Sequence, residues 1–258
     1  MTKPNFIFFD CESNSGRSHA DILTISALFV DNNFKLIEEF NCAARLRKSR
    51  IYEIDSFLVN GMDPFEVDKH PFSNFDLTKK TNDKFISWIN KGPVLFCAHN
   101  GYQFDYMLTS THLFTNLFTW PWIFSTGNAK QIDSLPILQN YDFYAPNTIA
   151  VELNEKSNKS FKLGSLCRMN GFDLGDKAHT ADADTLGMSK LMELINNKNP
   201  ELFQKCISLN DKKNVLSRIK DVYYFCHPET FFGRTRQFTS SYLCLRSHTS
   251  NEILKLIG

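Results

Sequence analysis

The first apolar run of the chain, residues 6–9, reads Phe-Ile-Phe-Phe and contains no polar side chain. In a strand, successive side chains point to opposite faces of the sheet, so a run that is apolar at every position is typical of a strand covered on both faces. Such a strand needs other layers above and below it. The chain is therefore expected to place this strand inside a sheet, between layers of helices.

The following segments supply those layers. Strands are predicted at 22–30, 34–40 and 94–98, with a turn at 31–33, and a short strand leads into a helix around 131–135. Helices are predicted near 76–90, 103–115, 161–170 and 180–196. After Pro200 we expect a helix or two and then β-like runs at 221–226, 239–246 and 252–257. This order predicts an α/β fold with a mixed sheet and helices on both of its faces.

Charge and cysteine content limit the function classes. The chain of 258 residues has 29 basic and 28 acidic side chains, but residues 201–258 hold nine basic and five acidic ones. This basic tail indicates an anionic partner, or only a Lys-rich solvated face. The seven scattered cysteines, without a CxxC pair, argue against a disulfide framework or a zinc ribbon and favour a reducing, cytoplasmic location. The longest apolar stretch, 22–30, is too short for a membrane-spanning helix, so no membrane partner is expected.

Acidic side chains follow two of the predicted strands. Asp10 and Glu12 are two residues apart on an extended chain and should point to the same side of the sheet. Asp105 follows the strand at 94–98, whose carboxyl end would meet the same edge. Carboxylates brought together repel each other unless a cation neutralises them, so this edge is a candidate hard-metal site. Alternatively, Asp10 and Glu12 open an exposed loop and Asp105 only complements a helix dipole.

A third segment adds a further carboxylate and a histidine. Asp184, Met188, Leu191 and Ile195 fall on one stripe of the helix predicted at 180–196. A carboxylate on an apolar stripe must be paired or bound to metal. His179 precedes this helix and is a candidate general base, although an isolated histidine is more often a surface or structural residue.

Together these residues resemble the DEDDh, or DnaQ-like, 3′→5′ exonucleases. The pattern Asp-x-Glu, then Asn-x-x-x-Phe-Asp, then His-x-x-x-x-Asp is matched by Asp10 and Glu12, by Asn100 and Asp105, and by His179 and Asp184. The resemblance implies a ribonuclease-H-like, mixed five-stranded sheet flanked by helices. It would form an exonuclease domain over residues 1–198, followed by a helical linker and a partial SH3-like module over residues 199–258.

Within this family the chain most resembles bacterial exonuclease I. The similarity lies in Phe-Lys-Leu-Gly-Ser-Leu at 161–166, which precedes the His and Asp motif, and in Phe-Gly-Arg at 232–234, where the SH3-like module would begin. It covers residues 5–195 and extends to 201–257. The chain ends where exonuclease I would still continue, so a fragment of a longer protein or a shortened relative is expected.

The resemblance implies two-metal hydrolysis of single-stranded DNA from the 3′ end, with release of 5′-mononucleotides. Two Mg²⁺ ions, for which Mn²⁺ can substitute, would be held by Asp10, Glu12, Asp105 and Asp184. Asp10 would bridge both ions, Asp105 would act through water, and His179 would accept the proton of the attacking water. An RNA 3′-end exonuclease of the same fold, or a catalytically silent nucleic-acid-binding scaffold, remains the alternative.

Substrate contacts are the least specific expectation. The family usually continues Asp-x-Glu with Thr and Gly, whereas Ser13 and Asn14 follow here, so the family pattern does not define how the 3′ end is held in this chain. Asn100 is a further candidate for this contact. Candidate phosphate contacts are the basic residues Arg45, Arg47, Lys48, Arg50, Arg234 and Arg236, any of which could be ordinary solvated surface. Single-stranded nucleic acid, with DNA preferred, is the expected partner of a monomer, and further domains or a single-strand-binding protein are additional candidates.

Overall fold

The computed structural model describes residues 3–17, 20–49, 52–118, 122–172, 180–220, 224–231, 234–241, 245–248 and 251–254, and only the backbone from residue 218 onward. Its centre is a five-stranded sheet in the order β3-β2-β1-β4-β5, formed by β1 (Asn5–Ser13), β2 (Ile22–Val30), β3 (Leu36–Ala43), β4 (Val94–Ala98) and β5 (Ala129–Asp133). β1 pairs antiparallel with β2 and parallel with β4, and β5 extends the parallel side. The predicted mixed sheet is confirmed.

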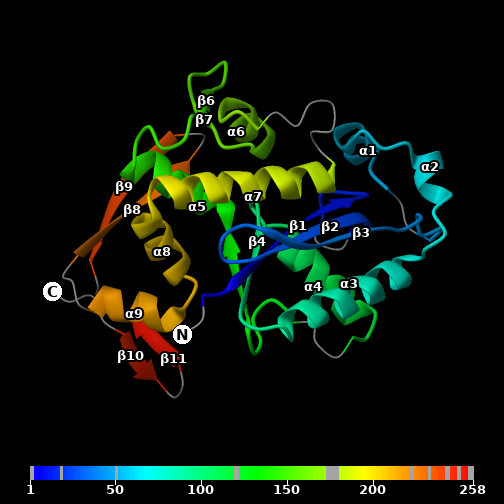
Figure 1. The fold of residues 1–258 in the computed structure, drawn as a ribbon, viewed down its shortest axis with the longest axis horizontal. Helices are drawn as coiled ribbons and strands as arrows, with labels where there is room; N and C mark the ends of the chain where they lie inside the picture. The colour runs from blue at the N-terminus through cyan, green and yellow to red at the C-terminus, as the bar shows by residue number, and fades with distance from the viewer. Residues whose placement is uncertain are drawn as a thin grey trace.

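Helices cover both faces of the sheet, as Figure 1 shows, with α7 (Ala181–Lys198) on one side and α3 (Asn74–Ile89) and α4 (Asp105–Thr115) on the other. The strand β1 is the reason for both layers. Phe6 and Phe8 pack in the core beside α7, whereas Ile7 and Phe9 pack in the core that includes Trp88 of α3. The sequence pattern at 6–9 therefore predicted the two-sided burial correctly.

The remaining helices are shorter. They are α1 (Ile54–Asn60), α2 (Pro64–Asp68), α5 (Ser134–Tyr144), α6 (Leu163–Met169), α8 (Pro200–Ser208) and α9 (Lys212–Lys220). The sequence analysis did not predict α1 and α2. α8 belongs to the core of the sheet, because Phe203 and Ile207 are buried with Phe6. None of the helices in the described part of the chain is long and apolar enough to cross a membrane.

Small two-stranded sheets complete the chain. β6 (Glu152–Leu153) pairs with β7 (Lys159–Ser160), β8 (Tyr224–Phe231) with β9 (Arg234–Ser241), and β10 (Leu245–His248) with β11 (Asn251–Leu254). β8 and β9 extend over 227–231 and 234–238, which the sequence analysis did not predict as strands. The described part of the chain after α9 thus consists of two antiparallel pairs, and the SH3-like arrangement and the domain boundary at 198 stay predictions.

Candidate metal centre

Asp10 and Glu12 occupy the carboxyl end of β1 and point to the face covered by α7. This orientation follows from the alternation of the strand, because Phe8 lies on the α7 side and Cys11 lies in the opposite core. On the neighbouring strand β2, Asp10 is opposite Ser26 and Glu12 is opposite Thr24. The expectation that both carboxylates share one side of the sheet is met by this geometry.

Asp184 reaches the same place from the first turn of α7. Met188, Leu191 and Ile195, on the same stripe of the helix, are fully buried against the sheet. The hydroxyl groups of Thr185 and Ser26 lie 3.2 Å apart and link the start of α7 to β2. The carboxylate of Asp184 is thereby directed toward the end of β1.

Carboxylate oxygens of Asp10, Glu12 and Asp184 all lie within 4.8 Å of one another. Each of these three side chains is partly buried. An all-oxygen set of this kind suits a hard divalent cation such as Mg²⁺, Mn²⁺ or Ca²⁺. The cluster can therefore bind a divalent metal ion.

Asp105 stands beside this group at the first residue of α4. Its side chain is buried, and its Oδ1 accepts a hydrogen bond from the backbone N–H of Cys11 at 3.0 Å. The bond joins α4 to the segment of β1 between Asp10 and Glu12. Asp105 lies outside the 4.8 Å group, so the structure brings three of the four predicted ligands into direct proximity and holds the fourth next to them.

The turn that places Asp105 depends on Gly101. A Cβ atom at this position would lie 2.4 Å from the Cβ of Ala98, which is closer than any real contact, so only glycine fits between β4 and α4. Asn100 precedes it in the left-handed region, with φ 60°, and is exposed. Asparagine tolerates this conformation better than most residues, which gives Asn100 a structural reason in addition to its predicted contact with substrate.

Simultaneous ionisation of all carboxyl groups of the cluster is strongly unfavourable. Burial, together with the charges of Asp10 and Asp184, raises the pKa of Glu12 to about 9. Burial likewise raises the pKa of Asp10 well above its ordinary value, and the charges of Asp105 and Asp184 add to this effect. Burial raises the pKa of Asp105 to about 8, although the bond from Cys11 opposes the shift. A bound cation would offset this repulsion.

A surface hollow of about 560 Å³ adjoins the cluster. Its lining includes Thr24 and Ser26, the residues of β2 opposite Glu12 and Asp10, and Thr180 in front of α7. Met62, His70 and Phe72, from the segment between β3 and α3, close the other side. The described lining contains none of the three carboxylates, so the hollow lies next to the residues that flank the cluster.

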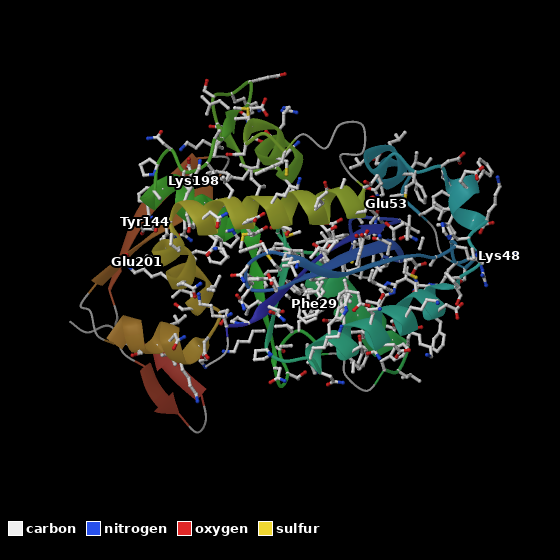
Figure 2. All side chains as sticks on the ribbon, viewed as in Figure 1. Phe29, Lys48, Glu53, Tyr144, Lys198 and Glu201 are labelled. Atoms are coloured by element: carbon white, nitrogen blue, oxygen red, sulfur yellow. The ribbon has the colours of Figure 1, made fainter. Side chains whose placement is uncertain are left out.

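The other predicted site residues are distributed as follows. Ser13 and Asn14 are buried, and their side chains bond within the segment that links β1 to β2. Arg45 donates to the carbonyl of Pro71, and Lys48 is exposed at the periphery of the molecule beside α2 (Figure 2). His179 and Arg50 lie outside the described residues. Arg234 and Arg236 lie in β9, of which only the backbone is described.

Two buried carboxylates were missed by the sequence analysis. Asp133 ends β5 and accepts hydrogen bonds from the backbone N–H groups of Asn100 and Tyr102, and it also caps α5. The helix-capping pattern Asp133-Ser-Leu-Pro was the available signal. Asp21 lies at the entry to β2, is 2% exposed, and bonds to Arg47, which is therefore not a free cation. Its signal was weak, because an aspartate before a strand is more often exposed.

No protein-family model matches the chain. Among curated proteins, the exodeoxyribonuclease I of Buchnera aphidicola subsp. Schizaphis graminum is 27% identical over 262 residues, which cover 98% of this chain and 52% of that protein. The exodeoxyribonuclease I from the subspecies Acyrthosiphon pisum is 24% identical, covering 96% of this chain and 60% of that protein. The chain spans about half the length of the curated relatives it matches.

Solved structures agree with this similarity. Escherichia coli exonuclease I in complex with a dA16 oligonucleotide has a TM-score of 0.77 and 19% identity, covering 83% of this chain and 45% of that one. Exonuclease I from Methylocaldum szegediense has a TM-score of 0.75 and 18% identity, covering 84% of this chain and 46% of that one. The chain therefore resembles exonuclease I in sequence and shares its fold.

Proposed function

We propose that this protein is a metal-dependent 3′→5′ exonuclease that releases 5′-mononucleotides from single-stranded DNA. The observation that carries the proposal is the meeting of Asp10, Glu12 and Asp184 within 4.8 Å beside an open hollow. The similarity to proteins named exodeoxyribonuclease I supports a nuclease role for this cluster. Fold alone would not suffice, since one fold hosts many activities.

A divalent cation fits the residues present. The donors are all carboxylate oxygens. Burial and mutual repulsion raise the pKa values of Asp10 and Glu12, so a bound cation would stabilise their ionised forms. We assign Asp10, Glu12 and Asp184 as direct ligands of Mg²⁺ or Mn²⁺, with Asp105 as the supporting fourth carboxylate. When bound, two such ions would neutralise the phosphodiester and lower the pKa of the attacking water.

The chain itself supplies orientation and proton transfer. Asp105 fixes the backbone between the two carboxylates of β1 through its bond to Cys11, so it acts on their geometry as well as on charge. His179 is proposed as the general base that accepts the proton of the attacking water, since a histidine can be neutral at cellular pH. The hollow lined by Thr24 and Ser26 is the proposed place for the terminal nucleotide.

A gel assay with end-labelled oligonucleotides tests the proposal. Single-stranded DNA and RNA of one sequence, each with either the 3′ or the 5′ end blocked, are incubated with Mg²⁺ or with EDTA. We expect mononucleotides from DNA with a free 3′ end, no reaction at a blocked 3′ end, and no reaction in EDTA. Asp10→Asn should abolish release, whereas Asp83→Asn, a change of the same type at an exposed residue of α3, should not.

The other outcomes discriminate among the alternatives. Faster release from RNA than from DNA would identify an RNA 3′-end exonuclease of the same fold. Binding of both nucleic acids without any turnover would identify a catalytically silent scaffold. Release from the 5′ end would contradict the proposed polarity.

A further inference from the structure

The pairing of β1 with β2 is irregular directly after Glu12. The register between β1 and β2 shifts at this point, because Glu12 is opposite Thr24 whereas Ser13 is opposite Ile22. A shift of this kind interrupts the ladder and bends the strand. The direction of the Glu12 side chain therefore depends on whatever fixes Ser13 and Asn14.

Polar contacts replace the ladder there. The side-chain oxygen of Asn14 accepts a hydrogen bond from the backbone N–H of Asp21 at 2.9 Å, and the backbone N–H of Asn14 donates to the carbonyl of Asp21 at 3.1 Å. The hydroxyl of Ser13 donates to the carbonyl of Ser15 at 2.7 Å. On the other side, the Asn60 amide donates to the carbonyl of Ser13 at 3.2 Å. Hydrogen bonds thus connect this segment to Asp21 on one side and to α1 on the other.

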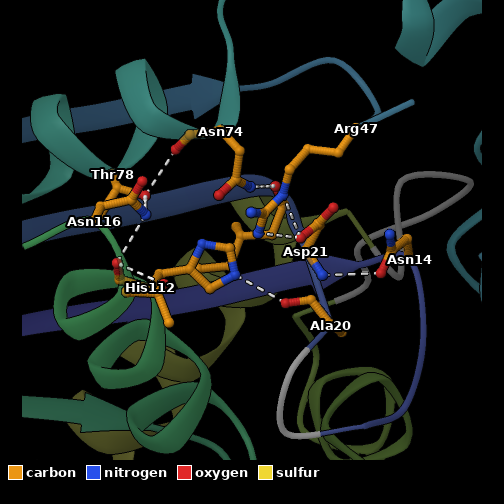
Figure 3. Close-up of polar contacts among 10 residues, drawn as sticks. Asn14, Ala20, Asp21, Arg47, Asn74, Thr78, His112 and Asn116 are labelled. Atoms are coloured by element: carbon orange, nitrogen blue, oxygen red, sulfur yellow. Dashed lines mark hydrogen bonds and ion pairs between the residues drawn. The ribbon is translucent and has the colours of Figure 1, made fainter. Parts of the chain in front are cut away.

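Side chains from α3 and α4 bond to the backbone on either side of Asp21 (Figure 3). His112 of α4 bonds through Nε2 to the carbonyl of Ala20 at 2.8 Å. Asn74 of α3 donates through Nδ2 to the carbonyl of Ile22 at 3.1 Å. The backbone on both sides of Asp21 is therefore fixed by two different helices.

The carboxylate of Asp21 is held by Arg47. It is 2% exposed, and its Oδ1 accepts bonds from both Nε, at 2.8 Å, and a terminal nitrogen of Arg47. Its Oδ2 has no hydrogen-bond partner within the described part of the chain. A buried carboxylate without a counter-charge is destabilising, so loss of Arg47 would disturb the Asp21 side chain and, through it, the segment that Asp21 holds.

We propose that Arg47 is a positioning residue of the metal centre. Through Asp21 and Asn14 it fixes the end of β1 and so the direction of Glu12, and it does not serve as a phosphate contact. The inference rests on the proposed function, which supplies the reaction that it positions. The side chain of Arg45, two residues earlier, donates to the carbonyl of Pro71 instead of to Asp21.

The experiment compares Arg47→Gln and Asp21→Asn with the unaltered protein. Mn²⁺ affinity is measured by calorimetry without nucleic acid, and kcat, KM and the salt dependence of binding are measured on a single-stranded oligonucleotide. Both variants should lower Mn²⁺ affinity and kcat by up to roughly tenfold, the lower end of the effect of losing a group that is bonded directly to a metal ligand. KM and the slope of log affinity against log salt should stay the same.

Two further variants separate positioning from general destabilisation. Arg47→Lys keeps the charge but loses the two-nitrogen geometry, so its Mn²⁺ affinity should fall between those of the unaltered protein and Arg47→Gln. Arg168→Gln removes an arginine that pairs with Glu152 near α6, and it should leave Mn²⁺ affinity unchanged. Melting temperatures of all variants show which of them are folded under the assay conditions.

The inference is overturned if folded Arg47→Gln keeps its Mn²⁺ affinity and kcat while its salt slope falls by about 0.7, the value for one phosphate of a single strand that is no longer neutralised. It is also overturned if Asp21→Asn keeps both Mn²⁺ affinity and kcat. Failure of the proposed function looks different, because the unaltered protein would then release no nucleotide. The Mn²⁺ measurement still decides the role of Arg47 in that case.

Discussion

Burial raises the pKa of Asp10 well above its ordinary value, and the charges of Asp105 and Asp184 raise it further. We expect Asp10→Asn to abolish turnover more completely than Asp105→Asn, because Asp10 is part of the 4.8 Å group and Asp105 is not. In EDTA the same variant should have a higher melting temperature than the unaltered protein, because it relieves repulsion. Nucleotide release and thermal unfolding measure the two effects. Retained activity in Asp10→Asn would contradict the site assignment.

The metal-free protein should lose stability as the pH rises. Glu12, with a pKa of about 9, and Asp105, with a pKa of about 8, bind protons more tightly in the folded than in the unfolded state. Their contribution to the free energy of unfolding is therefore full at acidic pH and decreases as the pH rises from the ordinary carboxyl range toward 9. Melting temperatures in EDTA between pH 5 and 9 should show this decrease, and Glu12→Gln should weaken it. A flat profile in EDTA would argue against the burial of these groups.

His179 carries the prediction on proton transfer. We expect His179→Ala to lower the rate roughly 10²- to 10⁴-fold with little change in substrate affinity, which is the usual contribution of a positioned general base. The rate of the unaltered protein should rise with pH through the histidine titration and then level off. An identical pH profile in His179→Ala would remove this residue from the mechanism.

At this scale the sequence predicted the placement of three carboxylates, while their roles and those of the cations stay predictions. The shared side of Asp10 and Glu12 and the inward stripe of Asp184 follow from strand and helix periodicity, which fixes the face that a side chain takes. Arg47 shows why cations escape such reasoning. Its partner Asp21 is 26 residues earlier, and no local pattern reveals an ion pair between two loops.

Among the elements, the connection from β4 to α4 is the most constrained. Gly101→Ala should destabilise the protein by about 1–3 kcal/mol, the usual cost of overpacking, because its Cβ would meet that of Ala98. It should also lower activity by displacing Asp105. Gly164→Ala at the start of α6 is the matched control, since a Cβ there meets nothing within 4 Å. Urea unfolding of both variants checks the difference, and equal stability of the two would contradict the close approach.

The long helices α3 and α7 were predicted from the sequence, whereas the short helices α1 and α2 were not. α3 begins near its predicted position because Ser73 and Asp76 form a capping box in front of an amphipathic run. α1 and α2 have seven and five residues, too few to show a helical period. They also expose Leu58 and Phe65, which reverses the usual relation between hydrophobicity and burial. In the tail, parts of β8 and β9 were missed because Pro228 and the polar residues of β9 are not typical of strands.

For the whole molecule, the basic tail is proposed as an electrostatic clamp on single-stranded DNA. A chain that ends at residue 220 keeps α8 and should fold, yet it lacks four of the nine basic residues of the tail, Arg234, Arg236, Arg246 and Lys255, and should bind single strands more weakly. Its salt slope should fall by about 0.7 for each phosphate group that these four residues would otherwise neutralise. Binding measured at several salt concentrations provides the test, and unchanged affinity and slope would leave the part of the tail after residue 220 without this role.

A shorter cut serves as the comparison. A chain that ends at residue 198 loses Phe203 and Ile207 from the core and should unfold at much lower temperature. Equal melting temperatures for the two truncations would mean that α8 is dispensable to the fold.

The alternation of side chains along β1 also limits which mutations this protein can accept in evolution. Phe6 and Phe8 share a face with Asp10 and Glu12, and the opposite face carries Ile7, Phe9 and Cys11. Gain of a single residue before Asp10 would turn the carboxylates into the layer of α3 and α4 and bring Phe9 into the place of Asp10, and loss of one would bring Cys11 there. The same mutation would disrupt the packing of the core and the proposed metal site. Variation in this strand is therefore confined to replacement of one side chain by another, while changes of length must fall in the loops.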